Sequence, residues 1–192
     1  MIAIVKYNAG NIRSVKNALD RIGVESVITN DPEILNNAEK VIFPGVGEAG
    51  TAMSYLRERG LDEVIISLMQ PFLGICLGMQ LMCSHSEEKD TTCLGIFKEN
   101  VRKFPSNGIV PHMGWNDFTK ADGPLFEGIA KTDNMYFVHS YYAEVGEDTV
   151  GVTDYLVPFT SALQKNNFYG VQFHPEKSAD VGQKLLENFL KI

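Results

Sequence analysis

The sequence predicts an α/β fold in which a mainly parallel central sheet carries helices on both faces and gains antiparallel strands. The first observation is that, through the first half, short apolar runs alternate with segments whose apolar residues recur at helical spacing. The second is that the second half consists mostly of short strand-like runs separated by turn residues. The third is length: 192 residues, 44% of them hydrophobic, suffice for one domain, residues 1–192, with both sheet faces covered.

The first half contains the βαβ pattern that is typical of a parallel sheet. Its expected strands are short apolar runs at residues 2–7, 24–28, 41–43 and 72–75. Its expected helices have apolar residues three or four positions apart, at 12–22, 32–35, 53–56, 64–68 and 77–82. Gly23 is expected to end the first helix, and Asp31-Pro32 is a helix N-cap followed by a first-turn proline.

The second half is expected to add antiparallel strands to this sheet. Its strand candidates are at residues 96–97, 101–104, 135–139, 150–153 and 161–164. A last strand, 169–173, ends at His174, and an amphipathic helix with apolar residues from Val181 to Leu190 follows.

Composition and charge argue against several classes of function. The net charge is −7 and no block of Lys or Arg is present, so nucleic acid is not an expected partner. No window reaches the ~18 apolar residues of a membrane span, and the N-terminal apolar run is too short for a signal peptide, so we expect a cytoplasmic protein without membrane contact. Three cysteines without a Cys-x-x-Cys pair predict neither a disulfide scaffold nor a metal site. No phosphate-binding or dinucleotide-binding glycine motif is present, so no cofactor is expected.

The most specific motif surrounds Cys76. Gly74-Ile75-Cys76-Leu77-Gly78 places a nucleophile between two glycines, after an apolar strand and before a helix, as in a nucleophile elbow. The backbone N–H of Leu77 would then face a developing oxyanion. The alternative is a buried structural cysteine, and that interpretation is preferred for Cys83 and Cys93, which lack this context.

A thiolate nucleophile needs a base, and His174 is the best placed of the four histidines. It follows an expected strand at the carboxyl edge of the sheet, where sites of α/β proteins gather. Glu176 lies two residues further and can orient the imidazole as the third member of a triad. The alternative is a surface His-Pro-Glu loop. A second oxyanion donor is expected from Gly45-Val46-Gly47, after the third strand, although Pro-Gly-x-Gly is also an ordinary turn.

Residues Gly74 to Gly78 with Gln80, together with His174-Pro175-Glu176, resemble the class I, or triad, glutamine amidotransferases. Further segments resemble the glutaminase-subunit family of imidazole glycerol phosphate synthase in histidine biosynthesis, at residues 7–15, 111–116, 137–141 and 174–178. The resemblance covers essentially the whole chain and implies a flavodoxin-like amidotransferase fold. Lys6 and Asn8 depart from the residues that the family commonly has beside the first-loop tyrosine.

The resemblance implies hydrolysis of L-glutamine to glutamate and ammonia by a triad of Cys76, His174 and Glu176. Gln80 and Glu88 match positions that hold the α-carboxylate and α-amino ends of glutamine, although Glu88 also fits a solvated charge cluster.

The resemblance also implies a partner: a separate (β/α)₈-barrel cyclase of the HisF type, forming a heterodimer. This cyclase would use the ammonia to make imidazole glycerol phosphate and an aminoimidazole carboxamide ribotide (AICAR). The implied docking and relay residues are Asn11, Pro111, His112, Met113, Gly114, Trp115, Asn116, Tyr136, His139 and Lys177. For His112 and His139 the alternative is a role in the core or a loop, and for Trp115 it is a role in the core. Hydrolysis of glutamine without an acceptor wastes ammonia, so the oxyanion loop is expected to present its N–H group only when the partner is bound. The isolated protein is therefore expected to have almost no glutaminase activity.

Three alternatives stay open at this point. A paralogous amidotransferase could feed another synthase, for example for amidino-sugar surface glycans, and the triad does not separate the two. A thiol-dependent α/β-hydrolase would place its acid before the histidine, whereas Glu176 follows His174. A non-enzymatic scaffold would need a broken site, and all three triad residues are present.

Overall fold

The computed structural model describes all residues, 1–192, and contains a twelve-stranded mixed sheet. Five neighbouring strands run parallel in the order β2-β1-β3-β4-β14. Their bounds are β1 Ile2–Val5, β2 Ser26–Thr29, β3 Lys40–Gly45, β4 Phe72–Cys76 and β14 Phe168–Val171. This 2-1-3-4-5 arrangement is that of a flavodoxin-like sheet, whose strand order reverses between β1 and β3. The predicted fold class is confirmed.

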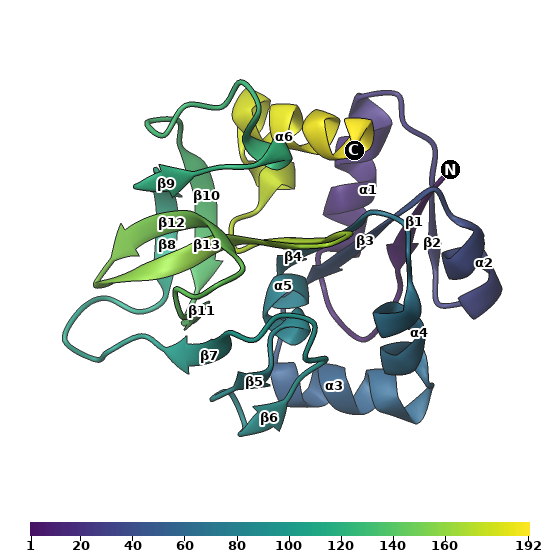
Figure 1. The fold of residues 1–192 in the computed structure, drawn as a ribbon, viewed down its shortest axis with the longest axis horizontal. Helices are drawn as coiled ribbons and strands as arrows, with labels where there is room; N and C mark the ends of the chain where they lie inside the picture. Colours follow the sequence, from purple (N-terminus) through teal and green to yellow (C-terminus); the bar gives the residue numbers. More distant parts are fainter.

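The other strands extend the sheet beyond β14 through β13, β11, β7, β5 and β6, while β12 pairs with β13 and β9 pairs with β12 (Figure 1). Strands β8 and β10 form a separate antiparallel pair. The bounds are β5 His85–Ser86, β6 Thr91–Thr92, β7 Asn100–Lys103, β8 His112–Asn116, β9 Lys120–Ala121, β10 Met135–His139, β11 Tyr141–Ala143, β12 Thr149–Tyr155 and β13 Val157–Lys165.

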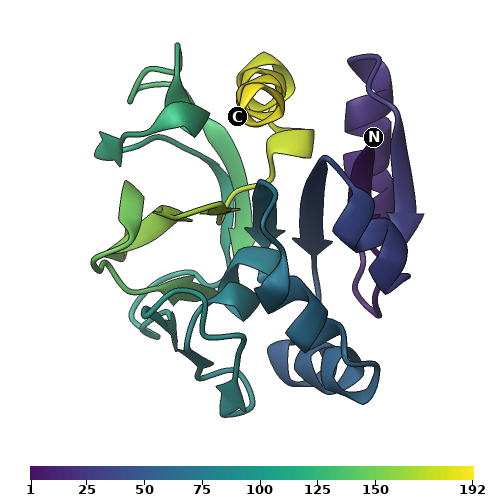
Figure 2. The same ribbon diagram turned by 45° about the vertical axis from the view of Figure 1, so that its right-hand side comes forward.

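Helices cover both faces of the parallel strands because successive side chains of a strand point to opposite faces. Ile2 and Ile4 pack on one face with α1 and α6, whereas Ala3 and Val5 pack on the other with α2 to α5. Figure 1 shows α1 and α6 together above the strands and α3 and α5 below them, and the turned view in Figure 2 agrees. The bounds are α1 Ile12–Arg21, α2 Pro32–Asn37, α3 Ala49–Glu58, α4 Leu61–Ser67, α5 Leu77–Met82 and α6 Ala179–Lys191. No helix has the length and apolarity needed to cross a membrane.

Local signals in the sequence account for several element ends. Asp31 caps α2, because its side chain accepts a hydrogen bond of 2.8 Å from the N–H of Glu33, and Pro32 occupies the first turn as predicted. Gly23 follows α1 with φ +74°, a backbone conformation that favours glycine.

Other expectations about the elements were wrong or incomplete. Residues 96–97 form a bend rather than a strand, because Phe97 is buried in the core while its N–H bonds to the carbonyl of Met82. The expected strands at 150–153 and 161–164 are parts of one longer β12–β13 hairpin. Strands β5, β6, β8, β9 and β11 were not predicted. Two-residue strands are too short for a periodic signal, and β8 contains Gly114 with φ +140° and no β-branched residue.

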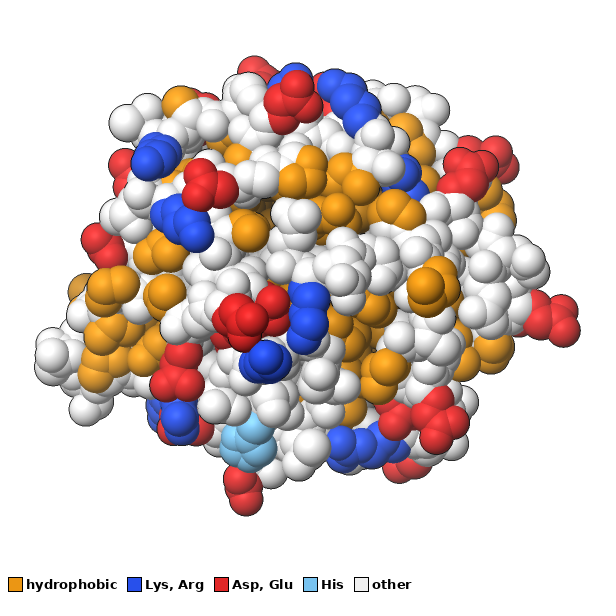
Figure 3. Space-filling model, viewed as in Figure 1, with side chains coloured by type: hydrophobic (Ala, Val, Ile, Leu, Met, Phe, Trp, Pro, Cys, Tyr) orange, Lys and Arg blue, Asp and Glu red, His pale blue; other side chains and the backbone are white.

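One end of the molecule carries exposed hydrophobic side chains. Figure 3 shows them gathered at the left of the view, over the β7–β8 loop and the β12–β13 turn. Ile109 is 80% exposed and Leu156 is 42% exposed. The hydroxyl of Tyr155 donates to the carbonyl of Ile109 at 2.7 Å and ties the loop to the hairpin.

Candidate active site

Strand β4 ends at Cys76 in the sharp turn that the glycine motif predicts. Cys76 has φ 54° and ψ −110°, a strained conformation typical of a nucleophile held between strand and helix. A Cβ on Gly78 would lie 1.8 Å from the carbonyl oxygen of Phe43, and one on Gly74 would lie 2.9 Å from the backbone carbonyl carbon of Gly78. The two glycines are therefore required because α5 packs directly against β3 and β4.

His174 and Glu176 form a buried hydrogen-bonded pair just after β14. Nδ1 of His174 donates to Oε1 of Glu176 at 2.8 Å, and neither side chain is exposed. Nε2 of His174 is buried without a hydrogen-bond partner, so it is the nitrogen available for proton transfer. Burial opposes the charged form, but the Cys76 thiolate and the Glu176 carboxylate outweigh it and raise the pKa of His174 to about 10.

Asn11 lies against this pair. Its side-chain Nδ2 donates to Oε1 of Glu176 and is 3.3 Å from Nδ1 of His174. Because Nδ1 already carries the hydrogen given to Glu176, the carboxylate is the acceptor for Asn11. The sequence suggested a docking role for Asn11, whereas the structure places its amide beside the candidate triad.

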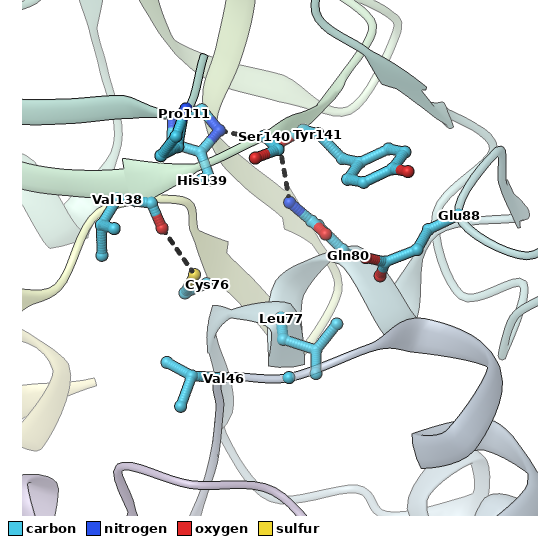
Figure 4. Close-up of a pocket in the computed structure, with 11 residues that line it drawn as sticks. Val46, Cys76, Leu77, Gln80, Glu88, Pro111, Val138, His139, Ser140 and Tyr141 are labelled. Carbon is cyan, nitrogen blue, oxygen red and sulfur yellow. Dashed lines mark hydrogen bonds between the residues drawn. The ribbon is translucent and has the colours of Figure 1, made fainter.

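A cavity of about 250 Å³ opens beside Cys76 (Figure 4). Gln80 lies between Cys76 and Glu88 in this view, while Val46 and Leu77 lie along one side. The cavity is lined by Val46, Gly47, Cys76, Leu77, Gln80, Glu88, Pro111, Val138, His139, Ser140 and Tyr141. The structure therefore brings the candidate nucleophile, the oxyanion loop and both expected glutamine-binding side chains to one cavity.

Gln80 and Glu88 offer acceptor atoms to this cavity. Nε2 of Gln80 donates to the carbonyl of Tyr141 and to Oε1 of Gln172, both at 2.9 Å, so both its hydrogens are engaged and Oε1 remains. Oε2 of Glu88 accepts from the N–H of Ala49 at 2.7 Å. Burial raises the pKa of Glu88, while the Ala49 hydrogen bond acts in the opposite direction.

The expected oxyanion loop lies between two cavities. The carbonyl of Val46 accepts a hydrogen bond of 3.1 Å from the N–H of Gly10. Behind the loop, a second cavity of about 130 Å³ is bordered by Val46, Gly47 and residues of the first loop and α3. Gly47 has φ +139°, so the backbone here adopts a conformation that side chains disfavour.

The suggested docking residues include two buried histidines, three exposed side chains and five residues that are half-buried. His112 and His139 are buried and joined by a hydrogen bond of 3.0 Å, and His139 Nδ1 donates to the carbonyl of Tyr141 at 2.7 Å. Their neutral tautomers follow from this carbonyl: His112 Nδ1 donates to His139 Nε2, and His112 Nε2 accepts from Asn116. Burial lowers the pKa of His112 to about 4 and that of His139 to about 3.

The exposed group includes the two largest hydrophobic side chains of β8. Met113 is 62% and Trp115 is 55% exposed, and Trp115 stacks edge-on against Tyr136. Lys177 is also exposed, whereas Pro111 and Gly114 are half-buried.

Gln172 and Val138 also contact Cys76, and sequence reasoning missed both. Nε2 of Gln172 lies 3.6 Å from the sulfur, and the carbonyl of Val138 lies 3.9 Å from it. A polar residue inside the apolar run that leads to His174 was a signal for Gln172. No local signal marked the Val138 carbonyl, because the contact joins residues that are 62 positions apart in the chain.

A doubly wound α/β fold with a cysteine elbow and a buried His–Glu pair defines a class: cysteine-dependent hydrolases of the triad type. Comparisons with known proteins agree. The family described as glutamine amidotransferase class-I matches residues 3–192. A crystal structure of a glutamine amidotransferase shares the fold with a TM-score of 0.75 and 20% identity, over the whole chain and 98% of the other. The structure of PurLQS from Thermotoga maritima shares it with a TM-score of 0.71 and 16% identity, over 99% of this chain and 97% of that one.

Sequence relatives narrow the assignment. A relative from Bacteroides thetaiotaomicron, "Imidazole glycerol phosphate synthase subunit HisH", is 57% identical over the whole chain and 99% of its own length. A HisH 1 subunit from Methanococcus maripaludis is 46% identical over the full length of both chains. The chain belongs to the class I glutamine amidotransferase family and, within it, to the family of HisH subunits.

Proposed function

We propose that the chain is the glutaminase subunit of an imidazole glycerol phosphate synthase and hydrolyses L-glutamine to glutamate and ammonia. The observation that carries this proposal is the cavity in which Cys76, the oxyanion loop and the acceptor atoms of Gln80 and Glu88 meet. Next to it, the Cys76 thiolate and the Glu176 carboxylate together raise the pKa of His174. A thiolate and an imidazolium that form together are the reactive pair of a cysteine acyl-transfer enzyme.

The chemistry proceeds in two acyl-transfer steps. The thiolate of Cys76 attacks the carboxamide carbon of glutamine, a C–S bond forms, and the carbonyl electron pair moves onto oxygen, stabilised by N–H groups of Leu77 and the Val46 loop. The C–N bond then breaks as His174 gives its Nε2 proton to nitrogen, and ammonia leaves. Water attacks the thioester, its proton passes to His174, and the C–S bond breaks to release glutamate.

The α-amino end of glutamine is held by Gln80 and Glu88 together. Oε1 of Gln80 accepts no protein hydrogen bond, and a carboxylate oxygen of Glu88 remains beyond the one bonded to Ala49. Acceptors suit an ammonium group and not a carboxylate, so this arrangement differs from the assignment of Gln80 to the α-carboxylate.

The partner is a (β/α)₈-barrel cyclase of the HisF type, in a heterodimer. The relatives are named as subunits of imidazole glycerol phosphate synthase, which implies a second subunit. Exposed Met113 and Trp115 supply the kind of large apolar side chains that anchor protein interfaces. Ile109 and Leu156 extend this surface, because Asn116 at the end of β8 donates to the carbonyl of Asp154 in the neighbouring hairpin.

Binding of the cyclase changes the orientation of the oxyanion loop. The hydrogen bond from Gly10 to the Val46 carbonyl holds the loop in one orientation, and the cavity behind the loop leaves room for another. A loop that completes its donor set only when the partner and its ligand bind prevents the waste of ammonia.

Glutamate release from glutamine tests the proposal. We expect little release by the chain alone, strong release with a HisF-type cyclase and its ribonucleotide ligand, and none after Cys76→Ala. Cys83→Ala, a change at another buried cysteine, should retain activity. No release under any condition would contradict the glutaminase assignment. Release that ignores the cyclase would contradict the partner and favour a paralogue that serves another synthase.

A further inference from the structure

Gln172 lies one residue beyond β14 and is completely buried beside the nucleophile. Its backbone N–H bonds to the carbonyl of Ser161 at 2.9 Å, which fixes its place next to β13. Its side-chain Oε1 accepts from Nε2 of Gln80 at 2.9 Å, and its own Nε2 lies 3.6 Å from Sγ of Cys76. The sulfur is the only hydrogen-bond acceptor that the structure gives to this amide nitrogen.

The orientation of this amide follows from its neighbours. A backbone carbonyl only accepts, so the carbonyl of Tyr141 requires the nitrogen of Gln80 to face it. The second hydrogen of that nitrogen then requires an acceptor from Gln172, which turns Oε1 of Gln172 toward Gln80. Nε2 of Gln172 is consequently directed at Cys76, and rotating either amide would set donor against donor.

Two polar groups contact the sulfur, and they favour opposite protonation states. The carbonyl of Val138, 3.9 Å away, can accept from an S–H group and repels a thiolate. The amide of Gln172 donates, so it gains most when the sulfur is negatively charged, because hydrogen bonds to charged groups are stronger. Because the buried N–H group of Gln172 has no other acceptor, leaving it without this hydrogen bond would be costly, and this further favours the thiolate form of Cys76.

We propose that Gln172 is a catalytic residue whose side-chain amide donates a hydrogen bond to Cys76 Sγ, holding the sulfur as a thiolate and aiming it at the substrate. Gln80 acts as a positioning residue for that amide in addition to facing the substrate cavity. The inference rests on the proposed glutaminase function for its role in turnover, but the contact with sulfur can be tested without turnover.

The test compares Gln172→Met, which keeps the length of the side chain and removes the donor, with the wild type. The pH dependence of Cys76 alkylation by iodoacetamide is measured on the chain and assigned by peptide mass spectrometry. We expect the midpoint to rise by about one pH unit, the lower end of what a hydrogen bond to a charged group contributes. In the complex with cyclase, kcat should fall about 10-fold, with KM for glutamine within about twofold.

Two further variants separate this effect from general damage. Gln172→Glu keeps an acceptor for Gln80 but places a carboxylate against the sulfur, so its midpoint should rise further than that of Gln172→Met. Gln70→Met removes an amide that bonds the carbonyl of Leu35 at 2.7 Å, away from the active-site cavity, and should leave the midpoint unchanged.

The outcomes distinguish the two proposals. Unchanged alkylation midpoints in folded Gln172→Met and Gln172→Glu would overturn the role of Gln172. A raised midpoint supports that role, and if the wild-type complex nevertheless releases no glutamate, the proposed function alone fails.

Discussion

Replacing Glu176 by glutamine tests how much the buried carboxylate contributes to catalysis. Oε1 of Glu176 accepts from both His174 and Asn11, while Oε2 is buried without a partner. Glutamine keeps the shape and an acceptor oxygen, but it removes the charge that faces the imidazolium 2.8 Å away. The amide nitrogen of the introduced glutamine would take the place of Oε2, where the structure offers no hydrogen-bond acceptor.

The expected magnitude follows from this geometry. Two unit charges 2.8 Å apart interact by about 6 kcal/mol at an effective dielectric constant of ~20. Breaking a buried pair by removing one partner costs about 3–5 kcal/mol. At 1.36 kcal/mol per factor of ten, we expect kcat to fall between about 100-fold and several thousand-fold. KM should stay within about twofold, because Glu176 does not line the cavity.

Steady-state glutaminase kinetics of the cyclase complex measure this effect, and thermal unfolding shows whether the variant is folded. Glu99→Gln is the matched control, since Glu99 is a buried carboxylate that accepts from the Asp148 N–H and also has an unpartnered Oε2. It should lower stability without lowering kcat. A folded Glu176→Gln complex with kcat within about threefold of wild type would show that the Glu176 charge does not contribute to catalysis.

Three other changes have definite expected outcomes. Gly78→Ala places a Cβ 1.8 Å from the carbonyl oxygen of Phe43 and should cost more than about 3 kcal/mol in urea unfolding, whereas Gly95→Ala, at φ +69° in open space, should cost about 1 kcal/mol. Equal costs would contradict the packing argument. The pKa of His139 is about 3 in the folded protein and about 6.5 when unfolded, so the unfolded chain binds more protons in this interval. The free energy of unfolding should therefore fall as pH decreases from about 6.5 toward 3, and His139→Asn should reduce that slope; an unchanged slope would assign the effect to other groups. Trp115→Asp should weaken cyclase binding at least about 10-fold in calorimetric titration and leave the melting temperature unchanged, since the side chain is 55% exposed. Unaltered affinity would remove β8 from the proposed interface.

The parts of the fold that could be predicted from the sequence depend on local signals. The elbow at Cys76 could be predicted because its two flanking glycines indicate that backbone segments pack too closely for any side chain. The structure shows such packing at Gly78, whose backbone lies against the carbonyl of Phe43. The uninterrupted apolar run from Ile2 to Val5 likewise indicates a strand that is buried on both faces of the sheet. In the structure, Ile2 and Ile4 pack on one face, and Ala3 and Val5 pack on the other. Parallel strands β4 and β14 are neighbours, so Cys76, at the end of β4, and His174, just after β14, lie at the same edge of the sheet.

The parts that could not be predicted depend on contacts between distant segments. The amide of Asn11 meets Glu176 across 165 positions, and nothing near Asn11 indicates this. The direction of the Gln172 amide depends on the carbonyl of Tyr141, through Gln80. Strand β8 pairs with β10 in a sheet of its own, and its weak strand propensity left it undetected.

The proposed function depends above all on Cys76 as the nucleophile that attacks the side chain of glutamine. The most direct measurement treats the cyclase complex with a glutamine analogue carrying a diazoketone in place of the carboxamide and locates the adduct by peptide mass spectrometry. We expect one adduct, on Cys76; glutamine should protect against it, and Cys76→Ala should abolish it. An adduct on Cys83 or Cys93, or a Cys76 that stays unmodified in a complex active with glutamine, would contradict this role of Cys76.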